Sequence, residues 1–171
     1  MMSDALAAEV ISVVICDDVP DMRRLLRAVL ASDSRMTVVA EAANGREAVR
    51  SVNDLQPDVV LLDLAMPEMD GLEVIDVITS TAPRTGIVVL SGFDSEGIGQ
   101  VALSSGADRY LEKGVDIERI IATVREVADS RRPPPTDADD RPSPQGLLAS
   151  LRVRLGRLLD RAAPVPIPLA P

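Results

Sequence analysis

The 171-residue sequence has no histidine and no tryptophan, and only one cysteine, one phenylalanine and one tyrosine. Without histidine, the chain lacks the usual general base and the most common transition-metal ligand in proteins. The single cysteine, Cys16, excludes an internal disulfide and a zinc cluster, and its place in the apolar run VVIC favours a buried, inert thiol. Because aromatic residues make up 1% of the chain, the core must be aliphatic. Any chemistry therefore depends on carboxylates, hydroxyls, one lysine or a group borrowed from outside.

Long apolar runs are also absent, since none approaches the roughly 20 residues that a membrane-spanning helix needs. The first ten residues carry acids where a secretion signal would carry positive charge. Both absences favour a cytoplasmic protein. Residues 1–130 hold 23 acidic and 11 basic side chains, a net charge of −12, whereas residues 131–171 have a net charge of +3. The acidic part has the wrong sign for binding nucleic-acid phosphates.

Apolar and β-branched segments predict five strands, at residues 11–16, 36–42, 59–62, 87–90 and 110–111. Apolar residues at helical spacing predict a helix after each strand: one that opens at Pro20, then 46–55 after a capping Asn44, 72–78, 95–104 and 117–127. The helix at 95–104 contains Gly97 and Gly99, each costing about 1 kcal/mol relative to alanine, and is therefore expected to be the least stable. Five alternating strands and helices predict an α/β fold with a doubly wound parallel sheet and helices on both faces.

Polar residues that could act chemically follow every predicted strand except the second. Taken singly, each has an ordinary explanation as a turn residue, a helix cap, a strand end or a solvated charge. Because the carboxyl ends of parallel strands share one edge of a sheet, these residues are expected to converge on one pocket. They are Asp17, Asp18, Asp63, Ser91 and Lys113.

Three carboxylates brought together repel one another unless a hard cation lies among them, and oxygen ligands without histidine or cysteine suit Mg²⁺. The hydroxyl of Ser91 and the ammonium of Lys113 add two contacts for phosphoryl oxygens, whose charge needs positioning and neutralisation. The pocket is expected to hold a phosphoryl group. Asp63, at the end of the fully apolar strand, would then be the nucleophile that forms an aspartyl-phosphate.

Four motifs in order resemble those of response-regulator receiver domains of two-component signalling: CDD at 16–18, LLDLAMPEMDG at 61–71, LSG at 90–92 and YLEKG at 110–114. The resemblance covers about residues 12–127. It implies a flavodoxin-like sheet in strand order 2-1-3-4-5 and phosphorylation of Asp63 by a histidine kinase or a phosphotransfer protein. The roles that it implies for the other residues are Mg²⁺ binding for Asp17 and Asp18 with Asp63 and the main-chain carbonyl of Ala65, phosphoryl contacts for Ser91 and Lys113, and an aromatic switch for Tyr110.

The sequence departs from the family pattern near the site. The family commonly has Lys-Pro with a cis bond in the last motif, but this chain has Lys113-Gly114, so a cis peptide is not expected. Ala65 is apolar and Phe93 is bulky, and both are expected to disfavour a hydrolytic water. We therefore expect a comparatively long-lived phosphorylated form.

Composition predicts further segments around a receiver domain at 11–130. We expect residues 1–10 to form an extension and the Pro- and Asp-rich stretch 131–145 to form a linker. The Pro-rich end 164–171 is expected to be disordered. Between the last two, residues 146–163 combine a leucine stripe with basic side chains and predict one amphipathic helix; the basic residues are Arg152, Arg154, Arg157 and Arg161. This helix is too small for a helix-turn-helix domain that binds DNA. Packing on its own receiver or self-association, docking to another protein, and contact with an anionic membrane remain open for it.

The leading functional hypothesis is a single-domain response regulator, a Mg²⁺-dependent switch whose Ser91/Tyr110 face controls a protein partner, with homodimerisation left open. It would not be an enzyme beyond its own phosphorylation and autodephosphorylation. A receiver-like scaffold that acts by binding without phosphorylation is the alternative. A phosphatase with an aspartyl intermediate is the third hypothesis, but such an enzyme would need a second acid where this chain has Ala65.

Overall fold

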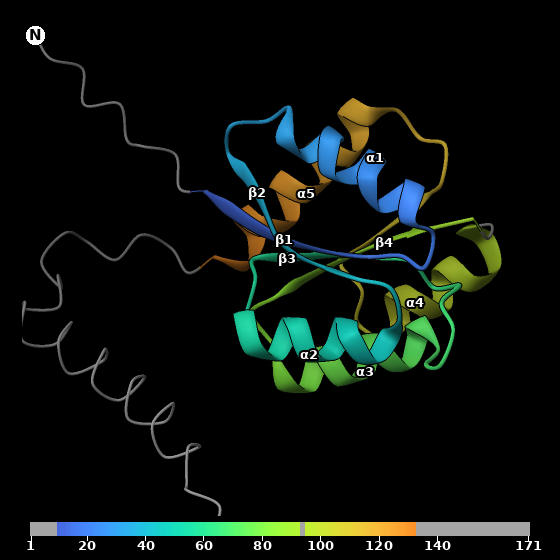
Figure 1. The fold of residues 1–171 in the computed structure, drawn as a ribbon. Coiled ribbons are helices and arrows are strands. Elements are labelled where there is room, and N and C mark those ends of the chain that lie inside the picture. Colours follow the sequence, from blue (N-terminus) through green and yellow to red (C-terminus); the bar gives the residue numbers. More distant parts are fainter. Residues whose placement is uncertain (1–9, 93–94, 133–171) are drawn as a thin grey trace, which may run out of the picture. The chain divides into compact units, whose positions relative to one another are not determined.

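The computed structural model describes residues 10–92 and 95–132 (Figure 1). The predicted helix at 146–163 and the end at 164–171 lie outside the described residues, as do Phe93 and nearly all of the predicted extension and linker.

One parallel sheet has the strand order β2-β1-β3-β4-β5, which confirms the predicted flavodoxin-like order. The strands are Ile11–Cys16 (β1), Met36–Ala42 (β2), Val59–Leu62 (β3), Gly86–Ser91 (β4) and Arg109–Glu112 (β5). All four residues of β3 are buried, as expected for a central strand covered on both faces. Because every pairing is parallel, the strands end together at one side of the sheet, here called the carboxyl edge, and begin together at the amino edge.

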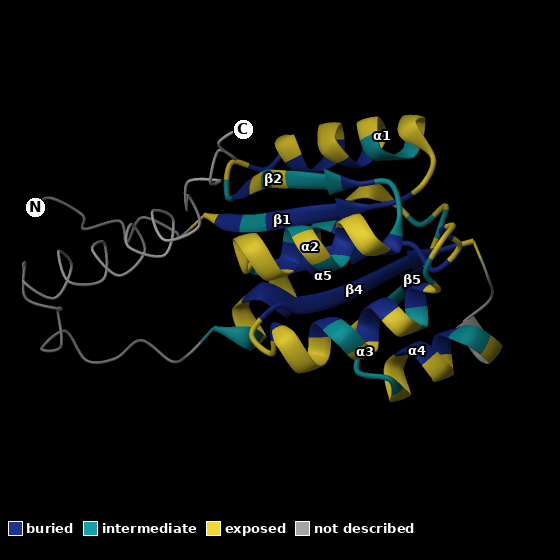
Figure 2. Cartoon of the chain, turned by 60° about the horizontal axis from the view of Figure 1, so that its bottom comes forward, coloured by how far each residue is buried: buried dark blue, intermediate teal, exposed yellow. Residues whose placement is uncertain are grey.

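Helices cover both faces of the sheet (Figure 1). They are α1 (Pro20–Ala31), α2 (Gly45–Leu55), α3 (Gly71–Thr81), α4 (Gln100–Ser104) and α5 (Ile117–Arg131). Helices α1 and α5 pack on one face, and α2, α3 and α4 pack on the other, each over its own aliphatic cluster. The central strands are buried, whereas the outer sides of the helices are exposed (Figure 2). No helix in residues 10–92 and 95–132 is long and apolar enough to cross a membrane.

Local signals in the sequence start three of these helices beside the carboxyl edge. Pro20 occupies the first turn of α1, where its missing N–H costs nothing. The side chain of Asn44 accepts a hydrogen bond from the Glu47 amide at 2.9 Å and caps α2, as predicted. The Asp70 carboxylate caps α3 in the same way, through the amide of Leu72 at 3.0 Å.

The segment predicted as one helix at 95–104 contains two structures. Residues Ser95–Gly99 form a π-helical turn, labelled η1, and only Gln100–Ser104 are α-helical. Gly97 and Gly99 lower the α-helical propensity of this segment, and the wider turn still packs Ile98 against the buried cluster under α2, α3 and α4. Where the glycines predict a weak α-helix, the structure therefore has a π-helical turn followed by a short α-helix.

The amino edge is held by charged groups that each have a partner. Asp58 Oδ2 accepts hydrogen bonds from both the amide and the hydroxyl of Ser12 at 2.7 Å. Four acids face four arginines at this edge, in the ion pairs Asp33–Arg125, Asp129–Arg35, Asp108–Arg131 and Asp58–Arg132. These pairs tie α5 to the loops at the start of the strands.

Candidate functional site

Three carboxylates meet at the carboxyl edge. Asp17 and Asp18 directly follow β1, and Asp63 directly follows the neighbouring strand β3. Each offers a carboxylate oxygen, and these oxygens all lie within 4.8 Å of one another. Asp17 and Asp63 are buried, whereas Asp18 is exposed to solvent. The site therefore concentrates negative charge where the neighbouring buried strands β1 and β3 end.

Lys113, which follows β5, bridges the two buried acids. Its Nζ lies 2.6 Å from Asp63 Oδ2 and 2.8 Å from Asp17 Oδ2. Burial acts to lower the pKa of this ammonium, but the hydrogen bonds to Asp17 and Asp63 outweigh it, and the pKa is raised above its ordinary value. The lysine therefore stays charged and neutralises only part of the charge of three acids.

The other oxygen of each buried acid is held by its own loop. Asp17 Oδ1 accepts a hydrogen bond from the amide of Val19 at 2.8 Å. Asp63 Oδ1 accepts one from the amide of Ala65 at 3.1 Å. Both carboxylates are thus oriented by an amide two residues later and by the same ammonium, and this pre-organises their positions.

Ser91 and Tyr110 lie on the two strands beyond Asp63. Ser91 is the last residue of β4 and is fully buried, between the strand that leads to Asp63 and the strand that leads to Lys113. Its carbonyl oxygen accepts a hydrogen bond from the Lys113 amide at 2.7 Å. Tyr110 pairs with Val89 in register and packs, half-buried, against the cluster under α2, α3 and α4. Ser91 therefore lies at the acidic site, and Tyr110, on the adjacent strand, lies on the face of the sheet that α4 covers.

The peptide bond after Lys113 is trans, like every other described one. Gly114 has φ 110°, a conformation that proline cannot adopt because its ring fixes φ near −65°. A proline at this position, as in the Lys-Pro pair of the family that the motifs resemble, could therefore not take up the backbone seen here.

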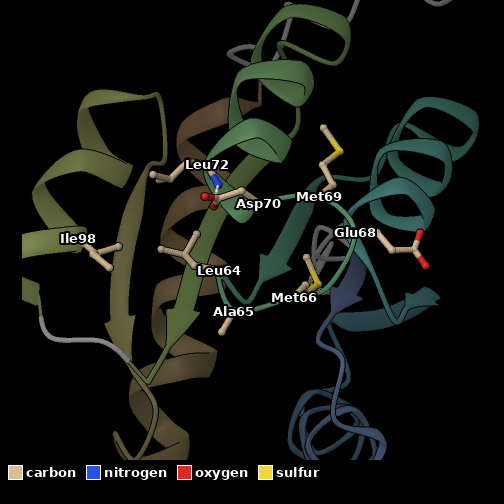
Figure 3. A pocket seen from close by; sticks show the side chains of 8 residues that line it. All are labelled: Leu64, Ala65, Met66, Glu68, Met69, Asp70, Leu72 and Ile98. Carbon is tan, nitrogen blue, oxygen red and sulfur yellow. Dashed lines mark hydrogen bonds between the residues drawn. The ribbon is translucent and has the colours of Figure 1, made fainter.

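A hollow of about 450 Å³ lies between the loop after β3 and the η1 turn. Leu64 and Leu72 line one side and Ile98 the other, while Glu68 points away from them (Figure 3). The loop packs tightly at Gly71, where an added Cβ would lie 2.5 Å from the Leu64 Cα. Glycine is required there because the opposing atom is backbone.

Cys16 is buried beneath the site, as predicted. Burial, and then the charge of Asp17, raise the pKa of its thiol. The thiol is therefore inert at neutral pH.

Two further residues contact this site without having been predicted from the sequence. Arg23 Nη1, on α1, donates a hydrogen bond to the main-chain oxygen of Asp17 at 2.6 Å. Its Nε lies 3.3 Å from Glu41 Oε2, next to last in β2. The second strand was expected to contribute no acting group because it ends in alanine, but Glu41 makes it part of the surroundings of the site.

Comparison with known proteins identifies the family. Residues 13–125 match the model of the response regulator receiver domain. The chain belongs to this family, which works in phosphorylation-dependent two-component signalling, and the family indicated by the motifs is confirmed. An acidic pocket that binds Mg²⁺ is typical of it.

The similar proteins differ in length. The chain is 34% identical over 118 residues to the chemotaxis protein CheY of Listeria monocytogenes, covering 69% of this chain and 98% of that protein. It is also 34% identical over 117 residues to the nitrate/nitrite response regulator NarL of Escherichia coli, covering 68% of this chain but 54% of NarL. Similarity to NarL therefore concerns only part of that longer protein.

Solved structures show the same fold. The response regulator domain of Thermotoga maritima CheB is 30% identical, with a TM-score of 0.67 over 74% of this chain and 100% of that one. A chain of the CheX–CheY–BeF₃–Mg²⁺ complex of Borrelia burgdorferi is 26% identical, with a TM-score of 0.65 over 68% of this chain and 88% of that one.

Proposed function

We propose that this chain is a signalling switch in which Asp63 accepts a phosphoryl group. The observation that carries the proposal is that three carboxylates place oxygens within 4.8 Å of one another, while the ammonium of Lys113 bridges two of them, Asp17 and Asp63. Asp63 is buried and oriented by the Ala65 amide and by Lys113, which prepares one carboxylate for nucleophilic attack. The similarity to receiver domains supports this assignment.

Mg²⁺ fits the donor set, because the site offers only oxygen ligands and has more acids than its one lysine can neutralise. Asp17, Asp18, Asp63 and the main-chain carbonyl of Ala65 would hold the ion. When bound, Mg²⁺ supplies positive charge for the phosphoryl oxygens. The Borrelia CheY complex, which contains BeF₃ and Mg²⁺, supports this assignment by its similarity to the chain.

The phosphoryl donor must come from another protein or small molecule, because the chain has no histidine. In the proposed step, a carboxylate oxygen of Asp63 forms the new bond to phosphorus while the bond from phosphorus to the donor's histidine nitrogen breaks. The electron pair of that bond stays on the imidazole, which takes a proton from solvent. Lys113 donates to the phosphoryl oxygens and offsets their charge. A histidine kinase or a phosphotransfer protein is the donor in this proposal.

The output of the proposed switch is a change at the Ser91/Tyr110 face that alters binding of a downstream protein. The Ser91 hydroxyl would follow the phosphoryl group and Tyr110 would follow Ser91, because the two residues lie on adjacent strands. The π-helical turn η1 contacts β5, the strand that carries Tyr110, and is a weak element that can adjust. Since Tyr110 is the only tyrosine and there is no tryptophan, intrinsic fluorescence reports this residue directly.

The phosphorylated form is proposed to be long-lived because the exposed side chain of Ala65 has no polar group that could hold a hydrolytic water. Ala65→Asn is expected to shorten its lifetime, since the amide could bind such a water. Loss of the phosphoryl mass with time, in both proteins, measures the effect. An equal or longer lifetime of the variant would contradict the role of Ala65.

Intact mass after incubation with acetyl phosphate and Mg²⁺ tests the proposed function. One phosphoryl group is expected on the wild type and none on Asp63→Asn. Asp70→Asn is the matched control, because it removes an acid from the same loop while asparagine still caps α3. If neither acetyl phosphate nor a histidine kinase adds a phosphoryl group to the wild type, the switch is refuted and the scaffold hypothesis is favoured. Equal phosphorylation of Asp63→Asn would refute the acceptor assignment.

A further inference from the structure

Arg23 connects the acidic loop with the edge strand of the sheet. Its Nη1 donates to the main-chain oxygen of Asp17 at 2.6 Å, and its Nε lies 3.3 Å from Glu41 Oε2. The side chains of Arg23 and Glu41 are 17% and 24% exposed, so this pair is much more sheltered than the other ion pairs of α1. The guanidinium therefore spans the distance between β2 and the loop after β1.

Glu41 is itself held in place. Its Oε1 accepts a hydrogen bond from Arg27 Nε at 2.6 Å, one turn further along α1. The following residue of β2, Ala42, accepts a hydrogen bond from the Asp17 amide at 3.1 Å. The peptide groups on both sides of Asp17 are thus bound, the amide by Ala42 of β2 and the carbonyl by Arg23.

We propose that Arg23, held by Glu41, is a positioning residue that sets the affinity of the Asp17–Asp18 loop for Mg²⁺. The inference rests on the proposed function, in which these acids hold the ion. By fixing the carbonyl of Asp17, Arg23 fixes the turn in which the Val19 amide orients the Asp17 carboxylate. Groups that orient metal ligands in this way change metal affinity by about 10-fold to 100-fold.

Arginine suits this role better than lysine. Its planar guanidinium donates in two directions at once, and here it reaches a carbonyl and a carboxylate on different elements. A lysine ammonium preserves the charge but loses this fixed fork. Arg23→Lys therefore separates geometry from charge.

The two effects of Arg23 on a bound cation have opposite signs. Its positive charge repels Mg²⁺, so loss of charge alone would strengthen binding. Its positioning of the loop favours Mg²⁺, so loss of the hydrogen bonds would weaken binding. The direction of the change in affinity therefore decides which effect is larger.

The experiment measures the Mg²⁺ dissociation constant of the full chain by calorimetry, together with hydrogen exchange of the Val19 amide without metal. Arg23→Gln and Arg23→Lys are both expected to raise the dissociation constant about tenfold and to speed this exchange. Glu41→Gln is expected to give a smaller change in the same direction, and the double variant Arg23→Gln/Glu41→Gln should be no worse than Arg23→Gln. Arg24→Gln is the control, because neighbouring Arg24 pairs only with exposed Asp21 in the contacts described for it.

Three results would overturn the proposal in different ways. Wild-type affinity in Arg23→Lys with tighter binding in Arg23→Gln would show that charge alone matters. A lower melting temperature with unchanged affinity and unchanged Val19 exchange would show a purely structural role. A wild type that binds no Mg²⁺ would refute the proposed metal site itself, and with it the inference that depends on it.

Discussion

The two edges of the sheet use the same kinds of side chain in different proportions. At the amino edge, four acids face four arginines, and the carboxylate of Asp58 also accepts two hydrogen bonds from Ser12. At the carboxyl edge, Asp17 and Asp63 share the ammonium of Lys113, and Asp18 adds a third carboxylate beside them. The amino edge is balanced internally, whereas the carboxyl edge retains an excess of negative charge.

This difference separates stability from binding. An acid whose hydrogen bonds are all made within the protein stabilises the fold and gains little from a ligand. Clustered acids with too few cations repel one another. An added cation, or a ligand that binds together with a cation, therefore stabilises them. We therefore expect changes at the amino edge to alter stability alone, and changes at the carboxyl edge to alter ligand binding and its coupling to stability.

The largest effect is expected for Lys113→Met. Hydrogen bonds to charged groups contribute about 1.5–3 kcal/mol, so acceptance of a phosphoryl group from acetyl phosphate should fall at least about tenfold. Without Mg²⁺ the variant should also be less stable than the wild type, and added Mg²⁺ should restore more stability to it. Intact mass and urea unfolding, each with and without Mg²⁺, measure these effects. A variant phosphorylated at the wild-type rate would contradict the role of Lys113.

Asp58→Ala tests the amino edge. The change leaves the amide and hydroxyl of Ser12 without their shared acceptor and should lower the free energy of unfolding by about 3 kcal/mol. Phosphorylation and Mg²⁺ affinity of the folded protein should stay unchanged. Asp54→Ala, at an exposed acid of α2, is the control and should have almost no effect on urea unfolding. Loss of Mg²⁺ affinity in Asp58→Ala would remove the distinction between the two edges.

Gly86→Ala tests packing at the same edge without changing a charge. A Cβ at the first residue of β4 would lie 2.3 Å from Val127 Cγ1, so the side chain of Val127 or the helix α5 that carries it would have to shift. Overpacking of this kind lowers the free energy of unfolding by about 1–3 kcal/mol. Urea unfolding with and without Mg²⁺ should give the same loss; a loss that Mg²⁺ abolishes would show that the two edges are coupled through α5.

The smallest effect is expected for Asp33→Asn and depends on pH. Hydrogen bonds from Arg125 and the Arg35 amide hold the pKa of Asp33 below its ordinary value. The folded state therefore binds fewer protons at this site, and the resulting stabilisation is present above about pH 4, the ordinary pKa of an aspartate, and is lost as the pH falls through the folded pKa. Wild type and variant should differ in urea unfolding at pH 7 and converge at acidic pH. A difference that grows on acidification would contradict this sign.

The sequence predicted the strands, the family and the residues that meet at the carboxyl edge with few errors of placement. These features depend on local patterns: the apolar run of β3, helix-start residues such as Asn44, and acids placed directly after strands. The change from α-helix to π-helix at η1 could not be predicted, because glycine lowers helix propensity without selecting another helix type.

Arg23 and Glu41 show what else local patterns missed. Arg23 is one of three arginines on α1. Glu41 is followed by Ala42, and this alanine led to the prediction that β2 ends without a polar group that could act. Neither residue has a sequence signal that distinguishes it from a solvated charge. Their contact depends on how α1 crosses the sheet and how β2 aligns with β1, including an irregularity between Val13 and Val14.

By itself, then, the sequence determined which acids and which lysine reach one edge of a parallel sheet, because strand ends and helix starts are encoded locally. Only the tertiary structure decided how the charges are shared: Lys113 between Asp17 and Asp63, and Arg23 between Glu41 and the Asp17 carbonyl. The physical reason is distance along the chain. Hydrogen-bond partners that lie on different strands are chosen by register and packing, which no local pattern specifies.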